Sequence, residues 1–274
     1  MKCSRYNRNP LPVHGSGDPR TCFTQLSPAQ VLDRYGPPQS LLCSSAKMKK
    51  CKRVGVLAAV LYMTPGILCT DATQGCLAAC LGHCSGRMQM PTHALCRDRR
   101  TAFYLERPEA FETLLEIEIW THVAKAKRLG LRPAVRLNGS SDLAWEVRHR
   151  GLFDAFPTVA FFDYTKNVAR MQRFLARRSW PTNYHLTFSA APGNHAEAKK
   201  TLQNGGNVAV VFWPEVPTRF WDFPVIDGDK HDARFLDAPA SVVALTAKGL
   251  ARTDTTGFTV RVGAATSSSL AVAA

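Results

Sequence analysis

Short runs of apolar residues, mostly β-branched or aromatic, recur along the chain, and each run ends in polar residues. Most of these runs are continuously apolar rather than alternating, which is typical of parallel strands covered on both faces. The middle runs recur about every 25 residues, which is the span of one βα unit. The pattern predicts seven strands, over residues 56–62, 132–137, 158–162, 184–188, 207–212, 224–226 and 241–245.

Two stretches between these runs carry the signals of helices. Residues 109–129 follow a proline, have glutamates near the start and basic residues near the end, and precede Gly130. That order of charges suits the helix dipole, and glycine suits the position after a helix. A second helix is predicted over residues 195–203, where Asn194 and Glu197 resemble a capping box.

Alternating strands and helices predict an α/β fold with a mostly parallel sheet, because crossovers are right-handed and helices must cover the sheet. Six to seven βα units favour a complete or partial parallel (β/α) barrel, and an open doubly wound sheet is the alternative. The 274 residues are enough for one such domain. We expect an irregular basic N-terminal arm over residues 1–45, a single barrel-like domain over 46–263 and a flexible tail of small residues over 264–274.

The net charge of +14 adds to this picture, because the basic excess is concentrated near the N-terminus. The first 53 residues hold ten Lys and Arg against Asp18 and Asp33. A basic arm of this kind binds nucleic acid through phosphate contacts, or is a solvated extension. The lack of interleaved aromatic residues for base stacking favours the solvated extension.

An apolar run over residues 54–69 follows four basic residues and resembles a membrane anchor. Pro65 interrupts the run, which is shorter than the about 20 residues that a membrane helix needs. A buried strand and a turn at residues 64–66 are the better interpretation. Residues 1–45 also lack the apolar core of a signal peptide, so we expect neither a secretory leader nor membrane contact.

Polar residues follow the predicted strands at the ends where α/β proteins bind ligands. In a parallel sheet these ends share one edge, where aspartates bind a cation and lysines neutralise an anion. The competing interpretation is that Asp and Ser after a strand are helix N-caps or turn residues. On the functional interpretation, the catalytic candidates are Asp142, Asp163, Lys166, Asp227, Asp229 and Lys248, and the substrate-binding candidates are Asn138, Ser141, Thr165, Ser189 and Asp232.

Four cysteines lie within sixteen residues, at Cys69, Cys76, Cys80 and Cys84. Thiolates this close are suited to hold a metal ion or an iron–sulfur cluster. On one helix the last three would share a face, at positions i, i+4 and i+8. The spacing lacks the two separate knuckles of a structural zinc site, which favours an iron–sulfur cluster over the alternative, zinc. Free cysteines in an apolar core are the competing interpretation.

Several longer stretches resemble a known family. They are LAAVLYMTP, CLAACLGHCSGR, AVRLNGSSDLAWE, FFDYTKNVAR, NYHLTFSAA, GGNVAVVF, FPVIDGDKHDARFLD and VVALTAKG. In this order they are similar to the gene-product-88-like proteins of phages and prophages. The resemblance implies a phage or prophage origin and a bacterial host cytoplasm, but no reaction. The family pattern matches Cys69, Cys76 and Cys80. At the position of Cys84 other members usually carry a different residue, which implies a three-thiolate site.

The cysteine motif before a series of βα units also resembles, more weakly, the radical S-adenosylmethionine enzymes. Their usual spacing is CxxxCxxC, from which this chain departs at the third cysteine. That similarity is at the level of the fold and carries little about function.

Together these features predict a metal- or iron–sulfur-binding α/β-barrel enzyme that acts on a polar or anionic substrate, nucleotide-related substrates included. One alternative is a non-enzymatic phage protein that binds nucleic acid through its basic arm. Another is a host-interaction protein with a structural zinc. The chain has no GxGxxG, no P-loop motif and no HExxH, so a dinucleotide, P-loop or zincin site has no support.

Overall fold

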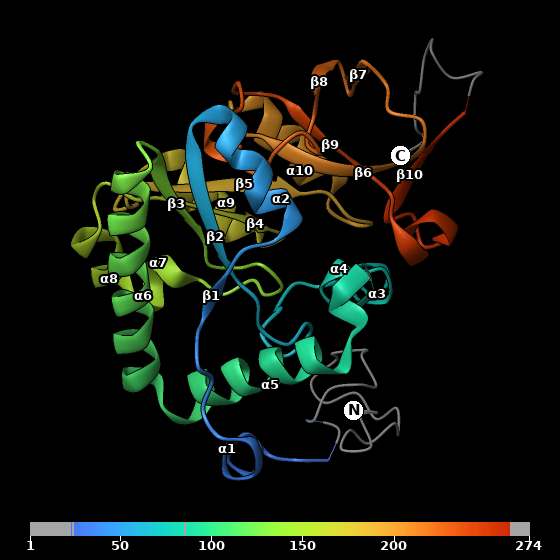
Figure 1. Cartoon of the computed structure of the whole chain (residues 1–274). Coiled ribbons are helices and arrows are strands. Elements are labelled where there is room, and N and C mark those ends of the chain that lie inside the picture. Colours follow the sequence, from blue (N-terminus) through green and yellow to red (C-terminus); the bar gives the residue numbers. More distant parts are fainter. Residues whose placement is uncertain (1–22, 24, 85, 264–274) are drawn as a thin grey trace.

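A ten-stranded, mostly parallel β-sheet forms the centre of the fold (Figure 1). The structure, a computed structural model, describes residues 23, 25–84 and 86–263, with the backbone alone for residues 83 and 84. The strands are β1 (Leu42–Cys43), β2 (Val56–Leu61), β3 (Arg132–Arg136), β4 (Ala160–Thr165), β5 (Tyr184–Ser189), β6 (Val208–Pro214), β7 (Arg219–Phe220), β8 (Phe223–Asp227), β9 (Val242–Thr246) and β10 (Thr259–Val262).

Strands β2 to β6 lie side by side in chain order, and each pairs in parallel with the next. Strand β9 follows β6, and β8 lies outside β9. Strands β1 and β7 form short antiparallel pairs at the two edges. Strand β10 pairs with the last residues of β6, beyond the part that β5 pairs with.

The seven strands predicted from the apolar runs are all present, as β2 to β6, β8 and β9. The prediction missed β1, β7 and β10, which have two, two and four residues. Strands this short do not give a periodic pattern that can be recognised in a sequence.

The sheet is open, so the expected complete barrel is wrong, whereas the expected mostly parallel α/β sheet is confirmed. A barrel requires its two edge strands to pair with each other. Here the described edges are the short antiparallel strands β1 and β7, which lie at opposite ends of the strand order.

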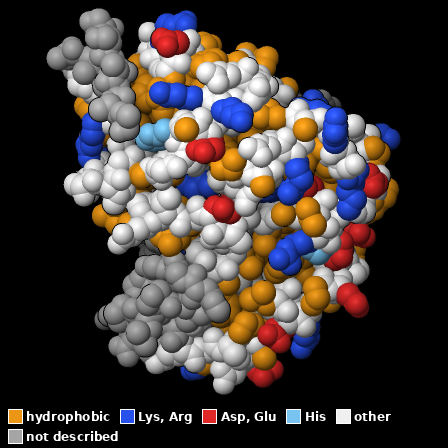
Figure 2. Space-filling view, turned by 180° about the vertical axis from the view of Figure 1, so that it is seen from behind, with side chains coloured by type: hydrophobic (Ala, Val, Ile, Leu, Met, Phe, Trp, Pro, Cys, Tyr) orange, Lys and Arg blue, Asp and Glu red, His pale blue; other side chains and the backbone are white. Residues whose placement is uncertain are grey.

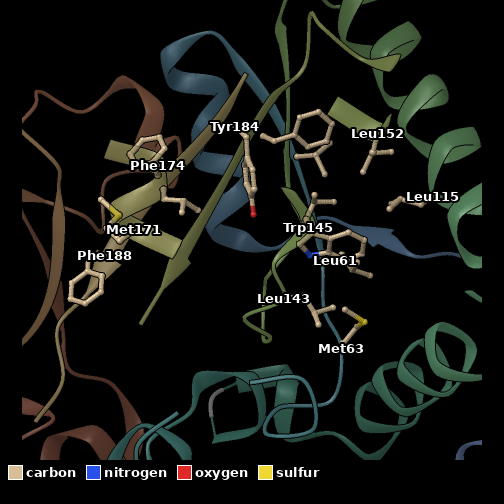
Figure 3. Packing of buried hydrophobic residues seen from close by; sticks show 14 of the residues in the cluster. Leu61, Met63, Leu115, Leu143, Trp145, Leu152, Met171, Phe174, Tyr184 and Phe188 are labelled. Atoms are coloured by element: carbon tan, nitrogen blue, oxygen red, sulfur yellow. The ribbon is translucent and has the colours of Figure 1, made fainter. Parts of the chain in front are cut away.

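The helices that connect the parallel strands pack on the sheet and bury their apolar sides. Strands that advance in one direction through right-handed crossovers place these helices on one face. Figure 3 shows part of this core, with Trp145, Tyr184 and Phe188 among its members. The helices are α6 (Pro108–Arg128), α7 (Trp145–Arg148), α8 (Arg150–Ala155), α9 (Val168–Ala176) and α10 (His195–Gln203).

Both predicted helices are confirmed, as α6 and α10. Gly130 follows α6 with a left-handed φ of 63°, as predicted for the glycine after this helix. The expected capping box at Asn194 is wrong, because the Asn194 side chain makes no cap hydrogen bond to α10. Its Oδ1 instead accepts a hydrogen bond from the backbone N–H of Ala191, at 2.8 Å.

Short helical segments of the chain cover the other face of the sheet, which we call the filled face. Figure 1 shows α2 (Ala46–Lys50) in front of the sheet and α9 and α10 behind it. Two 3₁₀ helices, η2 (Cys51–Val54) and η4 (Arg234–Leu236), also lie on this face. Met48, Cys51 and Ala233 pack there against residues of β2, β3 and β4.

Asp232, an expected substrate-binding residue, lies on the filled face and is fully buried. Its carboxylate lies 2.9 Å from Nη1 of Arg136 and 3.1 Å from Nζ of Lys47, and accepts a hydrogen bond from the Tyr164 hydroxyl. Burial alone would raise the pKa of Asp232, but these positive charges lower it to about 2. Asp232 is thus an ion-pair residue inside the fold.

Part of the expected irregular arm is folded. Helix α1 (Pro28–Tyr35) begins with a capping box of Ser27 and Gln30, and its buried Val31 and Leu32 join the core. Strand β1 pairs with β2. The rest of the expected arm, residues 1–22 and 24, and the expected tail, 264–274, lie outside the described residues.

No helix in the described ranges is long and apolar enough to cross a membrane. The apolar run over residues 54–69 forms β2 and then a turn, as predicted.

Replacement of Asp232→Asn should lower the free energy of unfolding at pH 7 by about 3 kcal/mol, because Lys47 and Arg136 lose their buried counter-charge. The folded-state pKa lies below the ordinary value of 3.8. The stabilisation is therefore complete above about pH 4 and is lost as the pH falls toward the folded pKa. Urea unfolding at several pH values measures both effects. Asp227→Asn is the exposed control, and an equal loss in the two variants would contradict the assignment.

Candidate functional site

Between β2 and α6, residues 62–84 and 86–107 lie across the carboxyl ends of the parallel strands (Figure 1). We call this segment the cap. The backbone N–H of Asp142 donates to the carbonyl of Leu68 in the cap, at 2.9 Å. The Ser140 hydroxyl donates to the carbonyl of Met63. The cap contains α3 (Gln74–Ala78), α4 (Leu81–Cys84), the 3₁₀ helix η3 (Gly86–Gln89) and α5 (Pro91–Glu106).

The four clustered cysteines lie on the cap, but not on one helix. Helix α3 ends at Ala78 and α4 begins at Leu81, so the expected common face at i, i+4 and i+8 is wrong. The break accompanies a close approach at Gly82, where a Cβ atom would lie 2.8 Å from Pro65 and 3.0 Å from Ser140. A continuous helix would give up this contact between the cap and the sheet.

Two of these cysteines, Cys69 and Cys80, lie near Ser140, and Cys76 neighbours Cys69. The Cys69 thiol donates to the Ser140 carbonyl at 3.5 Å, and the Cys80 sulfur adjoins Gly82, which packs on Ser140. Burial and, to a smaller extent, the neighbouring Cys76 raise the pKa of Cys69 to about 11.

Thiol donors suit zinc or an iron–sulfur cluster by chemistry. The arrangement of these cysteines does not form a metal site, because no three His, Cys, Asp or Glu residues of the described chain lie close enough together to hold a metal ion. The side chain of Cys84 lies outside the described residues. We therefore assign no chemical step to a metal.

The polar residues that follow β3 form a buried network with Asp163, which lies inside β4 and not after it as predicted. Asp163 is fully buried and accepts hydrogen bonds from the backbone N–H of Asn138 (2.6 Å) and from the Tyr184 hydroxyl (2.7 Å). Oδ1 of Asn138 accepts from the Ser141 hydroxyl and the Trp145 indole N–H. Asn138, Ser141 and Asp163 therefore hold the strand ends in place and are shielded from solvent.

Asp142 and Thr165 also serve the loop between β4 and α9. The Asp142 carboxylate accepts from the Thr165 hydroxyl (3.1 Å), from the Lys166 backbone N–H (2.9 Å) and from Nη1 of Arg170 (2.8 Å). These contacts give Asp142 a structural role, because they tie the segment after β3 to the loop after β4 and to α9.

Lys166 and Ser189 remain partly exposed at the ends of β4 and β5. The Lys166 ammonium donates to the Ser189 hydroxyl oxygen at 3.0 Å and lies 5.7 Å from the centre of the Phe258 ring. Two helix N-termini adjoin the pair, because Asn167 caps α9 and Asn194, before α10, donates to the Ser189 carbonyl at 3.2 Å. The positive ends of two helices and an amine thus meet at one place.

The remaining candidates form a separate group at the ends of β8 and β9. The Lys248 ammonium lies 2.7 Å from the Asp229 carboxylate, whose other oxygen accepts from the Thr246 N–H. The Asp229 N–H donates to the carboxylate of exposed Asp227. Strands β5 and β6 separate this group from β4. The structure therefore does not bring the four expected aspartates into one cluster.

Comparison with known proteins gives one family. The profile described as gene product 88 matches residues 40–262, which is most of the chain. Searches of curated proteins and of solved structures found no match. Nothing in these comparisons supports the weaker similarity to radical S-adenosylmethionine enzymes.

Burial raises the pKa of Asp163 to about 7, although Arg170 and the Tyr184 hydrogen bond act in the opposite direction. We expect the carboxyl carbon of Asp163 to titrate near that pH in ¹³C NMR, with Asp163→Asn to assign the signal. The folded pKa exceeds the ordinary 3.8, so the folded state holds the proton longer than the unfolded state. The contribution of Asp163 to the free energy of unfolding, measured as the difference between the unmodified chain and Asp163→Asn, should then fall as the pH rises from about 4 to about 7 and level off above. A midpoint at the ordinary value would contradict this.

Proposed function

The chain belongs to the gene product 88 family, and we propose that it is an enzyme that acts on a small anionic substrate at the carboxyl ends of β4 and β5. The hydrogen bond between Nζ of Lys166 and Oγ of Ser189, 3.0 Å long, is the observation that carries the proposal. It joins a charged amine and a hydroxyl, both partly exposed, at the edge of the sheet where α/β proteins place their ligands.

The electrostatics of this edge favour an anion. Helix α9 begins directly after Lys166 and Asn167, and α10 begins close to Ser189. Backbone N–H groups and the helix dipole at such N-termini attract negative charge. The nearby carboxylate of Asp142 is paired with Arg170 at 2.8 Å, which limits its repulsion of a substrate. In this proposal Lys166 binds a phosphate or carboxylate group of the substrate, and the Ser189 hydroxyl donates a hydrogen bond to it.

Replacement of Lys166→Met should weaken the binding of pyrophosphate, used as a probe anion, about tenfold or more, because one charge-assisted hydrogen bond is lost. Calorimetric titration measures the affinity. Lys199→Met is the matched control, since it removes an exposed lysine of α10 that lies over the Trp221 ring. Similar affinities in the two variants, or no binding by the unmodified chain, would contradict the proposal.

We also propose that Cys69, Cys76 and Cys80 bind an iron–sulfur cluster or zinc on the cap. Support comes from the position of the Cys69 and Cys80 sulfurs beside Ser140 and Gly82, and from the effect of Cys76 on the pKa of Cys69. Because three donors are not assembled in the described residues, binding requires the cap to rearrange locally.

Anaerobic purification followed by metal analysis and an absorption spectrum tests the cysteine site. A cluster gives iron, sulfide and a broad band near about 400 nm, whereas zinc gives a colourless protein. Cys76→Ala and Cys80→Ala should each lose the bound metal. Cys96→Ala, at an exposed position of α5, should retain it. Unchanged metal content in the first two variants would end this proposal.

A further inference from the structure

A basic surface lines the amino ends of β2, β3 and β5, on the edge of the sheet opposite the cap. Three segments contribute to it, residues 52–56, 125–132 and 177–184, and none of them contains an Asp or a Glu. We call it the amino-edge surface. Its exposed basic residues are Lys52, Arg53, Lys125, Lys127, Arg128, Arg132, Arg177 and Arg178.

The sheet brings these segments together. The backbone N–H of Arg132 donates to the carbonyl of Gly55 at 2.9 Å, which joins the start of β3 to the end of η2. The positive charges of Arg177 and Arg132 both act on half-buried His185 in β5, so the second and third segments are also close. Figure 2 shows basic side chains on the upper right of its face and acidic ones on the lower right, in line with the glutamates that begin α6 and the lysines that end it.

Neighbouring acidic groups do not account for this charge. Within the described part of the chain, none of the eight residues forms an ion pair, whereas Lys47 and Arg136 on the filled face both pair with Asp232. Favourable contact with a helix dipole explains the basic last turn of α6. It does not explain Arg132, which begins a strand, or Lys52 and Arg53 in η2. Like charges without acidic partners repel one another and attract a polyanion.

The dimensions of the surface suit a nucleic-acid backbone. Strands β2 to β5 span three interstrand gaps of about 4.8 Å each, or roughly 14 Å in all. Phosphates of one DNA strand follow one another about every 3.4 Å along the helix axis, so several of them can face the surface at once. Trp120, 64% exposed and edge-on to Phe156, lies about two turns before the end of α6 and offers a ring for stacking.

An anionic membrane fits the surface less well. Binding in a membrane interface needs a continuous apolar face beside the basic residues. The apolar face of α6 is buried, with Phe111, Leu115 and Ile119 fully enclosed. Val54 and Leu129, the exposed apolar residues next to the basic ones in the sequence, belong to separate elements. The exposed Ile117 and Trp120 lie further back along α6.

We infer that the amino-edge surface binds the phosphate backbone of nucleic acid without reading its bases. The surface lies at the opposite edge of the sheet from Lys166 and Ser189, so the inference does not rest on the proposed enzyme site. It also differs from binding by the N-terminal arm, because all eight residues belong to the folded domain.

Fluorescence anisotropy with the full chain and a short labelled DNA duplex, or a single strand of the same length, tests the inference. The variant Lys127→Glu/Arg128→Glu should bind at least about tenfold more weakly, and the slope of log affinity against log salt should fall by about two. The control Arg87→Glu/Lys230→Glu changes the net charge equally at two exposed positions outside the surface and should bind within about threefold of the unmodified chain.

Circular dichroism and thermal unfolding should show both variants folded, since all four positions are exposed. Equal weakening of the two variants would overturn the inference, because net charge or the arm would then explain the binding. Binding of the unmodified chain to phosphatidylserine vesicles but to neither nucleic acid would overturn it as well.

Discussion

The guanidinium of Arg170 holds the carboxyl edge of the sheet together. It is 1% exposed and contacts three groups from different parts of the chain, the carboxylates of Asp142 (2.8 Å) and Glu146 (3.0 Å) and the hydroxyl of Tyr184. Tyr184 in turn donates to Asp163. A buried guanidinium must be paired in this way, because an unpaired charge in the interior is strongly unfavourable. The network thereby joins the segment after β3, the middle of β4, the first residue of β5 and the first turn of α9.

This network determines which polar groups are left for chemistry. The side chains of Asp142, Asp163 and Asn138 are engaged in hydrogen bonds with neighbouring groups of the protein. Lys166 differs from these residues. Its backbone N–H donates to the Asp142 carboxylate, whereas its side-chain ammonium extends to the Ser189 hydroxyl. The backbone N–H of Asp142 also binds the cap through Leu68. One loop therefore positions the amine and anchors the segment that carries the cysteines.

The strands and helices were largely predictable because their signals are local. The apolar runs give β2 to β6, and the charge order of α6 and the glycine after it give that helix nearly to its ends. The open sheet was not predictable, since the position of β8 outside β9 depends on pairing between distant strands. The roles of the aspartates were missed for a related reason. Arg170 looks like an ordinary residue of an amphipathic helix, and only the assembled sheet reveals that it pairs with Asp142.

The central claim is that an anion binds between α9 and α10 at the ends of β4 and β5. Hydrogen exchange followed by mass spectrometry, with and without saturating pyrophosphate, tests it most directly on the unmodified chain. The account predicts slower exchange in residues 163–170 and 187–195, where the backbone N–H groups of the two helix starts lie. Protection confined to residues 52–56, 125–132 and 177–184, or no protection at all, would contradict it.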